Sequence, residues 1–172
     1  MVPSGTDNVA VSHNKKLHSG NLSGGETTAG KSTHYHIMNS LRYTYEDNFV
    51  RGHLLNSRLG GMANEANLYP ITQTANRHHS VEVEEFVIDA ARRATVRNPI
   101  NYSVDVVPQA NQTANARVDF VCTAEYTDST GNPETPRRYV KNEDGNITGI
   151  RIESSPTAKT SLSPITFVSY SS

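Results

Sequence analysis

Three side chains in one stretch of the sequence are of types that can cooperate in hydrolysis. His53 follows an Arg-Gly pair in NFVRGHLLNSRLGG, Asn76 follows an Asn-Leu-Tyr-Pro segment, and Glu84 comes eight residues later. An imidazole with an ordinary pKa of about 6.5 can accept a proton from water at physiological pH. An amide carbonyl is a suitable ligand for a hard divalent cation such as Mg²⁺. Taken alone, each is more often a hydrogen-bonded loop histidine, a helix N-cap or a solvated charge.

A single amphipathic helix is predicted to carry Asn76 and Glu84. The apolar stripe that recurs at steps of three or four consists of Val83, Val87, Ala90, Ala91 and Ala94. We expect the helix to run from about residue 74 to about residue 97, just before Asn98-Pro99. At about 100° per residue, Asn76 heads the buried stripe and Glu84 lies about 80° from it. Of the neighbouring glutamates, only Glu84 is then expected to border the same site as Asn76.

The remaining elements are predicted from residue type and turn signals. Residues 34–45 and 48–55 have β-branched and aromatic character and are predicted as a β-hairpin or neighbouring strands, with His53 near a strand end. Asp144-Gly145 is a strong hairpin signal. Further strands are predicted in residues 100–108, 116–127 and 137–153. The expected fold class is α+β, with an antiparallel sheet and one main helix.

Composition limits the classes of protein that fit. With 16 Lys+Arg against 17 Asp+Glu, the charge is nearly balanced, so any attraction for phosphate must be local. No apolar run approaches the roughly 18 residues of a membrane span, and the N-terminus lacks the apolar core of a signal peptide. We therefore expect no membrane partner. The single cysteine, Cys122, cannot form an internal disulfide and is predicted to be buried in a strand.

Residues 1–33 differ in amino-acid composition from the rest of the chain. They are rich in Ser, Gly, Thr and Asn, with few large apolar residues, and are predicted to be a flexible polar arm or linker. Residues 34–172 are then expected to form one domain.

Two histidine pairs invite a zinc hypothesis. His34 and His36 form one pair, and the adjacent His78 and His79 form the other. Adjacent histidines diverge by about 100° on a helix, and no cysteine partner is available nearby. Zinc is therefore disfavoured.

The segments RGHLLNSRLGG, NEANLYPITQTANRHH and VEVEEF resemble, in their order and spacing, the DNA/RNA non-specific endonucleases. These are ββα-metal (His-Me finger) nucleases, marked by Asp-Arg-Gly-His, an Asn-Leu-x-Pro segment, and a metal-binding helical Asn followed eight residues later by Glu. The variant with Gly-His-Leu and a double glycine is similar to nuclease domains of bacterial polymorphic toxins. The resemblance covers roughly residues 42–88 and departs at Val50, where the family has its first aspartate.

The resemblance implies a role for each of the three side chains. His53 matches the general base, Asn76 the ligand of Mg²⁺ (or Mn²⁺), and Glu84 the downstream glutamate. Phosphodiester hydrolysis needs a deprotonated water, neutralisation of charge on phosphorus and help for the leaving oxygen. A rise of roughly 12 Å over eight helical residues argues against joint ligation by Asn76 and Glu84. Glu84 is therefore expected to act through metal-bound water or by orienting a neighbour.

Candidates for binding phosphate are less clearly defined. Arg42 is the nearest match to the family's arginine on the upstream strand, with Lys31 behind it. Arg51, two residues before the base, could also contact phosphate. Its side chain should point away from that of Gly52, and whether His53 shares its side is left open.

The resemblance leads to an expected function and two alternatives. We expect a metal-dependent endonuclease of DNA and/or RNA, secreted as a toxin or effector without a signal peptide by a specialised system. It would act in the cytoplasm of a target cell, and its producer would need a cognate immunity protein. One alternative is an inactive nuclease-like binding module, against which the intact His53, Asn76 and Glu84 argue. The other is a structural cargo domain of a secretion particle; an independent nuclease would keep its activity without residues 1–33.

Overall fold

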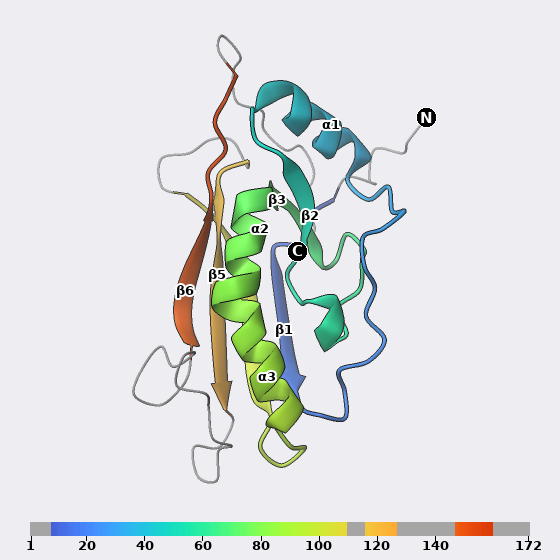
Figure 1. The fold of residues 1–172 in the computed structure, drawn as a ribbon, viewed down its shortest axis with the longest axis vertical. Helices are drawn as coiled ribbons and strands as arrows, with labels where there is room; N and C mark the ends of the chain where they lie inside the picture. The colour runs from blue at the N-terminus through green and yellow to red at the C-terminus, as the bar shows by residue number, and fades with distance from the viewer. Residues whose placement is uncertain (1–7, 110–115, 127–146, 160–172) are drawn as a thin grey trace.

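The computed structural model describes residues 8–109, 116–126 and 147–159 of the chain. Its main sheet is antiparallel with the strand order β1-β4-β5-β6, and a second antiparallel sheet contains only β2 and β3. The strands are β1 (Ser12–Leu17), β2 (Phe49–His53), β3 (Leu68–Thr72), β4 (Ile100–Pro108), β5 (Val118–Tyr126) and β6 (Ile147–Ser154). A long helical segment lies across the main sheet (Figure 1). The expected α+β class with one main helix is confirmed.

The main helix is one continuous segment made of three parts. It comprises α2 (Gln73–His79), the π-helical η3 (Ser80–Glu84) and α3 (Glu85–Arg93). All members of the predicted apolar stripe are buried. The helix ends earlier than predicted, because Ala94 is extended and the hydroxyl of Thr95 accepts a hydrogen bond from the Asn98 amide in a separate turn. No helix in the described part of the chain has the length and apolar character needed to cross a membrane.

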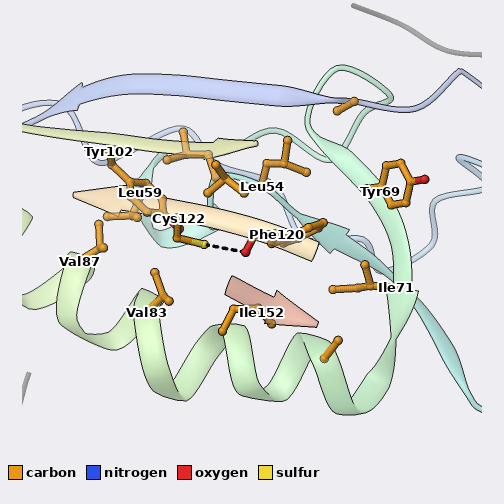
Figure 2. Packing of buried hydrophobic residues seen from close by; sticks show 14 of the residues in the cluster. Leu54, Leu59, Tyr69, Ile71, Val83, Val87, Tyr102, Phe120, Cys122 and Ile152 are labelled. Carbon is orange, nitrogen blue, oxygen red and sulfur yellow. Dashed lines mark hydrogen bonds between the residues drawn. The ribbon is translucent and has the colours of Figure 1, made fainter. Parts of the chain in front are cut away.

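The core lies between this helix and the main sheet. Val83 and Val87 face the sheet, where alternate residues of β4 and β5 such as Tyr102 and Phe120 point toward them (Figure 2). Cys122 is fully buried in β5, so its prediction is confirmed. The strands predicted in residues 100–108 and 116–127 are present as β4 and β5. Of the strand pair predicted in residues 137–153, the second strand is present as β6, and the first strand and the hairpin turn at Asp144-Gly145 lie outside the described residues.

The strand predicted for residues 34–45 is wrong, because these residues form the helix α1 (Tyr35–Thr44). The side chains of Ile37, Met38 and Leu41 are buried at helical spacing, and this packing overrides the β-propensity of the aromatic and branched residues around them. β2 consequently pairs with β3, and His53 lies opposite Leu68.

The polar arm predicted for residues 1–33 is wrong for the stretch that forms β1. This strand pairs with β4 along its whole length, and Leu17 at its end is fully buried, as is Val9 just before it. β1 lies at the edge of the sheet and buries few side chains, which explains why its sequence is polar.

Candidate active site

Two strands and a helix that follow one another in the chain form a compact ββα unit. β2 and β3 make an antiparallel pair, and α2 begins directly after β3. Thr72 caps the helix, because its hydroxyl accepts a hydrogen bond from the amide of Ala75 at 3.1 Å. This arrangement is consistent with the expected His-Me finger core. It places His53 at the end of β2 and Asn76 in the first turns of the helix.

His53 is half-buried and held by a backbone carbonyl. Its Nε2 lies 2.7 Å from the carbonyl oxygen of Glu26. That oxygen can only accept, so we assign the ring proton to Nε2, and Nδ1 is then the acceptor of the neutral ring. No described residue hydrogen-bonds to Nδ1. Burial lowers the pKa of His53 and the bond to Glu26 partly opposes this, so the ring is neutral at physiological pH.

Residues 21–33, which we call the covering segment, hold the side chains of Arg51 and His53 on β2. The amide of Glu26 donates to the carbonyl oxygen of Gly61 at 2.9 Å, while the Glu26 carbonyl binds His53. Arg51 donates from Nε to the carbonyl oxygen of Thr33. Arg51 and His53 therefore both face the covering segment. The sequence left open whether these two side chains share one side of the strand, and the structure shows that they do.

Asn67 fixes the loop that follows His53, a role that the sequence reasoning missed. Its side chain is buried; Oδ1 accepts from the Leu55 amide, and Nδ2 donates to the carbonyl oxygens of Leu55 and Met62, all at 2.8–2.9 Å. Buried amides are stable only when they are bonded in this way. Asn67 is the asparagine of the Asn-Leu-Tyr-Pro segment and lies directly before the buried strand β3.

The double glycine after this loop is required by the backbone. Gly60 has a φ of 88°, which side chains rarely tolerate. A Cβ on Gly61 would lie 1.7 Å from the carbonyl oxygen of Leu55. The two glycines therefore allow the close approach through which Gly61 reaches Glu26.

Glu84 is buried, whereas the neighbouring Glu82 and Glu85 are exposed. Burial raises the pKa of Glu84 to about 7, opposed by a hydrogen bond from the Asn56 side chain and by the charge of Arg58. Asn56 and Arg58 belong to the loop after His53, so Glu84 reaches that loop from the helix. The catalytic role predicted for Glu84 stays a prediction.

Asn76 is half-buried and exposes an unused amide group. Within the described part of the chain, its side chain makes no hydrogen bond. The structure therefore leaves its carbonyl oxygen available as a ligand. Its predicted role in metal binding stays a prediction.

Arg42 does not lie on a strand, as its match to the family had predicted, but on the exposed face of α1. Burial lowers the pKa of Arg51, and the positive charge of Arg42 lowers it further. Lys31, in the covering segment, pairs with the Glu26 side chain at 3.1 Å. The Glu26 carboxylate offsets the charge of Lys31, so Arg42 and Arg51 supply the local positive charge in a chain that is nearly neutral overall.

A pocket of about 440 Å³ lies away from His53. It includes Thr72, which pairs with Phe49 at the opposite end of the β2–β3 hairpin. Glu82 and Glu153 also line it, and their charges would repel a phosphate backbone. The candidate nucleic-acid surface is therefore the one around His53 rather than this pocket.

The described residues contain no cluster of three or more His, Cys, Asp or Glu side chains able to hold a metal ion. His78 is exposed and His79 is buried, so the two rings diverge as helical geometry predicted. His34 is buried and its Nε2 lies 2.7 Å from the carbonyl oxygen of Asn8. These contacts give the zinc hypothesis no support.

The comparisons with known proteins identify the family. The model of the DNA/RNA non-specific endonuclease family matches residues 12–125, more than half of the chain. The chain belongs to the DNA/RNA non-specific endonuclease family. Membership supports nuclease activity at the level of the family, and the match includes β1, in keeping with its place in the sheet. No curated protein and no solved structure matched the chain.

Glu84→Gln is expected to change how stability depends on pH. Burial raises the pKa of Glu84 from 4.5 to about 7, so between these values the folded state keeps a proton that the unfolded state has lost. The wild type therefore becomes less stable as the pH rises from 4.5 to about 7. The glutamine does not titrate and escapes this loss. The free energy of unfolding of the variant, compared with that of the wild type, should therefore be about 3 kcal/mol more favourable at pH 8 than at pH 4.

Urea unfolding of both proteins at pH 4, 6 and 8 measures this difference. Glu82→Gln is the matched control, because Glu82 lies on the same helical segment and is exposed. A difference between Glu84→Gln and the wild type that stays constant with pH would show that the Glu84 pKa is not raised.

Proposed function

We propose that this nuclease is a metal-dependent endonuclease that cleaves DNA and/or RNA with His53 as the general base. The observation that carries the proposal is the held imidazole: Nε2 is bonded to the Glu26 carbonyl, and Nδ1 is left to accept a proton. Burial favours the neutral ring that a base requires. Nothing in the sequence resembles a base-reading helix or a stacking platform, so we expect little base preference.

The side chains around His53 have complementary tasks in this proposal. His53 takes the proton from the attacking water through Nδ1, and the backbone bond to Glu26 keeps the ring in the required orientation. Arg51 uses Nε to bind Thr33, which leaves its terminal nitrogens for a phosphate oxygen. The exposed Arg42 adds positive charge that attracts the nucleic-acid backbone, whereas the charge of Lys31 is offset by its pair with Glu26.

Asn76 fits a hard divalent cation such as Mg²⁺ or Mn²⁺. Its amide is half-buried and unbonded within the described residues, and such cations accept one or two protein oxygens together with water and phosphate oxygens. When bound, the cation would neutralise charge on the phosphate and the leaving oxygen. The carboxyl of Glu84 is buried and is hydrogen-bonded to Asn56, which supports an indirect role for it.

Asn76→Ala is expected to raise the Mg²⁺ concentration needed for half-maximal cleavage by about 10-fold or more, because it removes the protein oxygen that holds the cation. Nicking of supercoiled plasmid over an Mg²⁺ titration measures this, with EDTA as the metal-free control. Gln73→Ala, an exposed change in the same helix, should leave the titration unchanged. An unshifted titration for Asn76→Ala would assign the metal to another ligand. A wild type that leaves plasmid supercoiled would favour the inactive binding module.

We further propose that the chain acts as a bacterial toxin domain. The support is the resemblance of its Gly-His-Leu, double-glycine and Asn-Leu-Tyr-Pro segments to polymorphic-toxin nucleases. It would be delivered by a specialised system into the cytoplasm of a target cell. An immunity protein would block it most simply with an acidic surface that lies over His53 and residues 56–73 and excludes the phosphate backbone. Wild type and His53→Ala expressed in bacterial cells test this: equal toxicity, or equal harmlessness, would contradict it.

A further inference from the structure

A cluster of polar side chains lies inside the core between the main helix and the sheet. His79, Tyr102 and Cys122 are at most 1% exposed and Glu84 is 4% exposed. Polar groups at such depth cost free energy unless they are bonded, and apolar side chains of similar size would fill the same space. The proposed reaction uses Glu84 but gives no role to His79 or Tyr102.

The contacts of His79 link the sheet to the loop after the catalytic base. Its Nε2 lies 3.1 Å from the Tyr102 hydroxyl on β4, and its Nδ1 lies 3.5 Å from Oε1 of Glu84. Among the described residues Nδ1 makes no hydrogen bond, so its approach to Glu84 is a close polar contact rather than a bond. Glu84 in turn bonds the side chain of Asn56, which follows β2 in the chain. A continuous path therefore runs from β4 to the loop beside His53.

The π-helical η3 is what brings His79 and Glu84 together. In an α-helix, residues five apart diverge by about 140°. In η3, the amide of Glu85 donates to the carbonyl oxygen of Ser80, five residues earlier, and this wider turn places residues five apart on one side. Single π-turns inside α-helices are frequently found at functional sites.

The pair is not an ordinary salt bridge. Burial lowers the pKa of His79 to about 3, so the ring is neutral at physiological pH. The His79 ring also stands edge-on against Phe120, with centroids 5.3 Å apart, and this contact fixes its plane. Phe120 fixes the plane and the Tyr102 hydroxyl fixes which edge faces Glu84, so the orientation of the ring is set by the sheet.

We propose that His79, oriented by Tyr102, is a positioning residue that holds the Glu84 carboxyl against Asn56 and so sets the loop beside the general base. The inference rests on the proposed nuclease function. His79, Tyr102 and Glu84 are too deeply buried to touch nucleic acid, so their loss should lower kcat and leave KM for plasmid nearly unchanged. Groups that support a site indirectly typically contribute about 10- to 100-fold to activity.

Two substitutions of His79 separate positioning from packing. His79→Asn places an amide near the position of Nδ1, facing Glu84, whereas His79→Gln places one near Nε2, facing Tyr102. We expect His79→Gln to lose about 10- to 100-fold in kcat, and His79→Asn to retain most of the wild-type kcat. Tyr102→Phe keeps the ring and removes only the hydroxyl, so a smaller loss is expected.

Thermal unfolding of each variant is measured in parallel. A purely structural role predicts that kcat follows the loss of stability in both His79 variants, and this result would overturn the proposal, as would wild-type kcat in a folded His79→Gln. A readout without activity keeps the test independent of the proposed function. The ¹⁵N shift of His79 Nδ1 should move in Glu84→Gln and stay fixed in Glu82→Gln. An unmoved shift in Glu84→Gln would overturn the pairing even if no cleavage is seen.

Discussion

His53→Ala is expected to lower the rate of phosphodiester cleavage by about two to four orders of magnitude, the usual contribution of a general base. The substitution removes Nδ1, the proposed proton acceptor, whose partner nitrogen Nε2 is held by the Glu26 carbonyl. The measurement is single-turnover nicking of supercoiled plasmid at saturating Mg²⁺. Under these conditions the chemical step is compared rather than binding.

His36→Ala is the matched control, because His36 is an exposed histidine on α1 outside the proposed site. It should cleave like the wild type. The pH profile gives a second check: burial lowers the pKa of His53, so wild-type activity should persist above that pKa and fall as the pH drops below it, with the acidic limb under pH 6.5. Near wild-type cleavage by His53→Ala would assign the base to another group.

The main helix could be predicted from the sequence because its packing is periodic. Val83, Val87 and Ala90 recur at steps of three or four residues, and this spacing buries one face of a helix. The π-turn between Ser80 and Glu84 could not be predicted, because it depends on how the side chains of the helix meet the sheet. Glu84 is buried within this π-turn, and its expected place bordering the same site as Asn76 stays a prediction.

The segment before the site was predicted poorly for two physical reasons. α1 contains aromatic and β-branched residues, which favour a strand. The helix forms because it buries Ile37 and Leu41 in the core. β1 is an edge strand whose side chains are mostly outside the core, so its sequence has the composition of a linker.

In the candidate site, the side chains could be predicted from the sequence, but the backbone groups that hold them could not. His53, Asn76 and Glu84 could be selected because their residue types and spacing are visible in the sequence. The groups that hold His53 and Arg51 are the backbone carbonyls of Glu26 and Thr33, which any residue type could supply. No motif can reveal such partners, and only the fold of the covering segment brings them to β2.

Deleting residues 1–33 is expected to abolish cleavage, contrary to what an independent domain starting at residue 34 would show. The deletion removes β1 and with it the fully buried Val9 and Leu17. Burial of each of these side chains contributes roughly 2 kcal/mol, against a total stability of about 5–15 kcal/mol for a domain. It also removes the carbonyl that holds the His53 ring. Plasmid nicking and circular dichroism of the truncated protein measure both effects.

Two further variants separate loss of the sheet from loss of the covering segment. Removing residues 1–7 deletes none of the described elements and should leave cleavage intact. Gly25→Ala keeps β1, but its Cβ would lie 1.9 Å from the carbonyl oxygen of Ser57, so the covering segment must shift away from the loop. We expect this variant to stay folded and to lose activity, because the Glu26 carbonyl then moves relative to His53. If the 1–33 deletion cleaves plasmid as fast as the wild type, the imidazole does not depend on Glu26, and the orientation assigned to its two nitrogens must be revised.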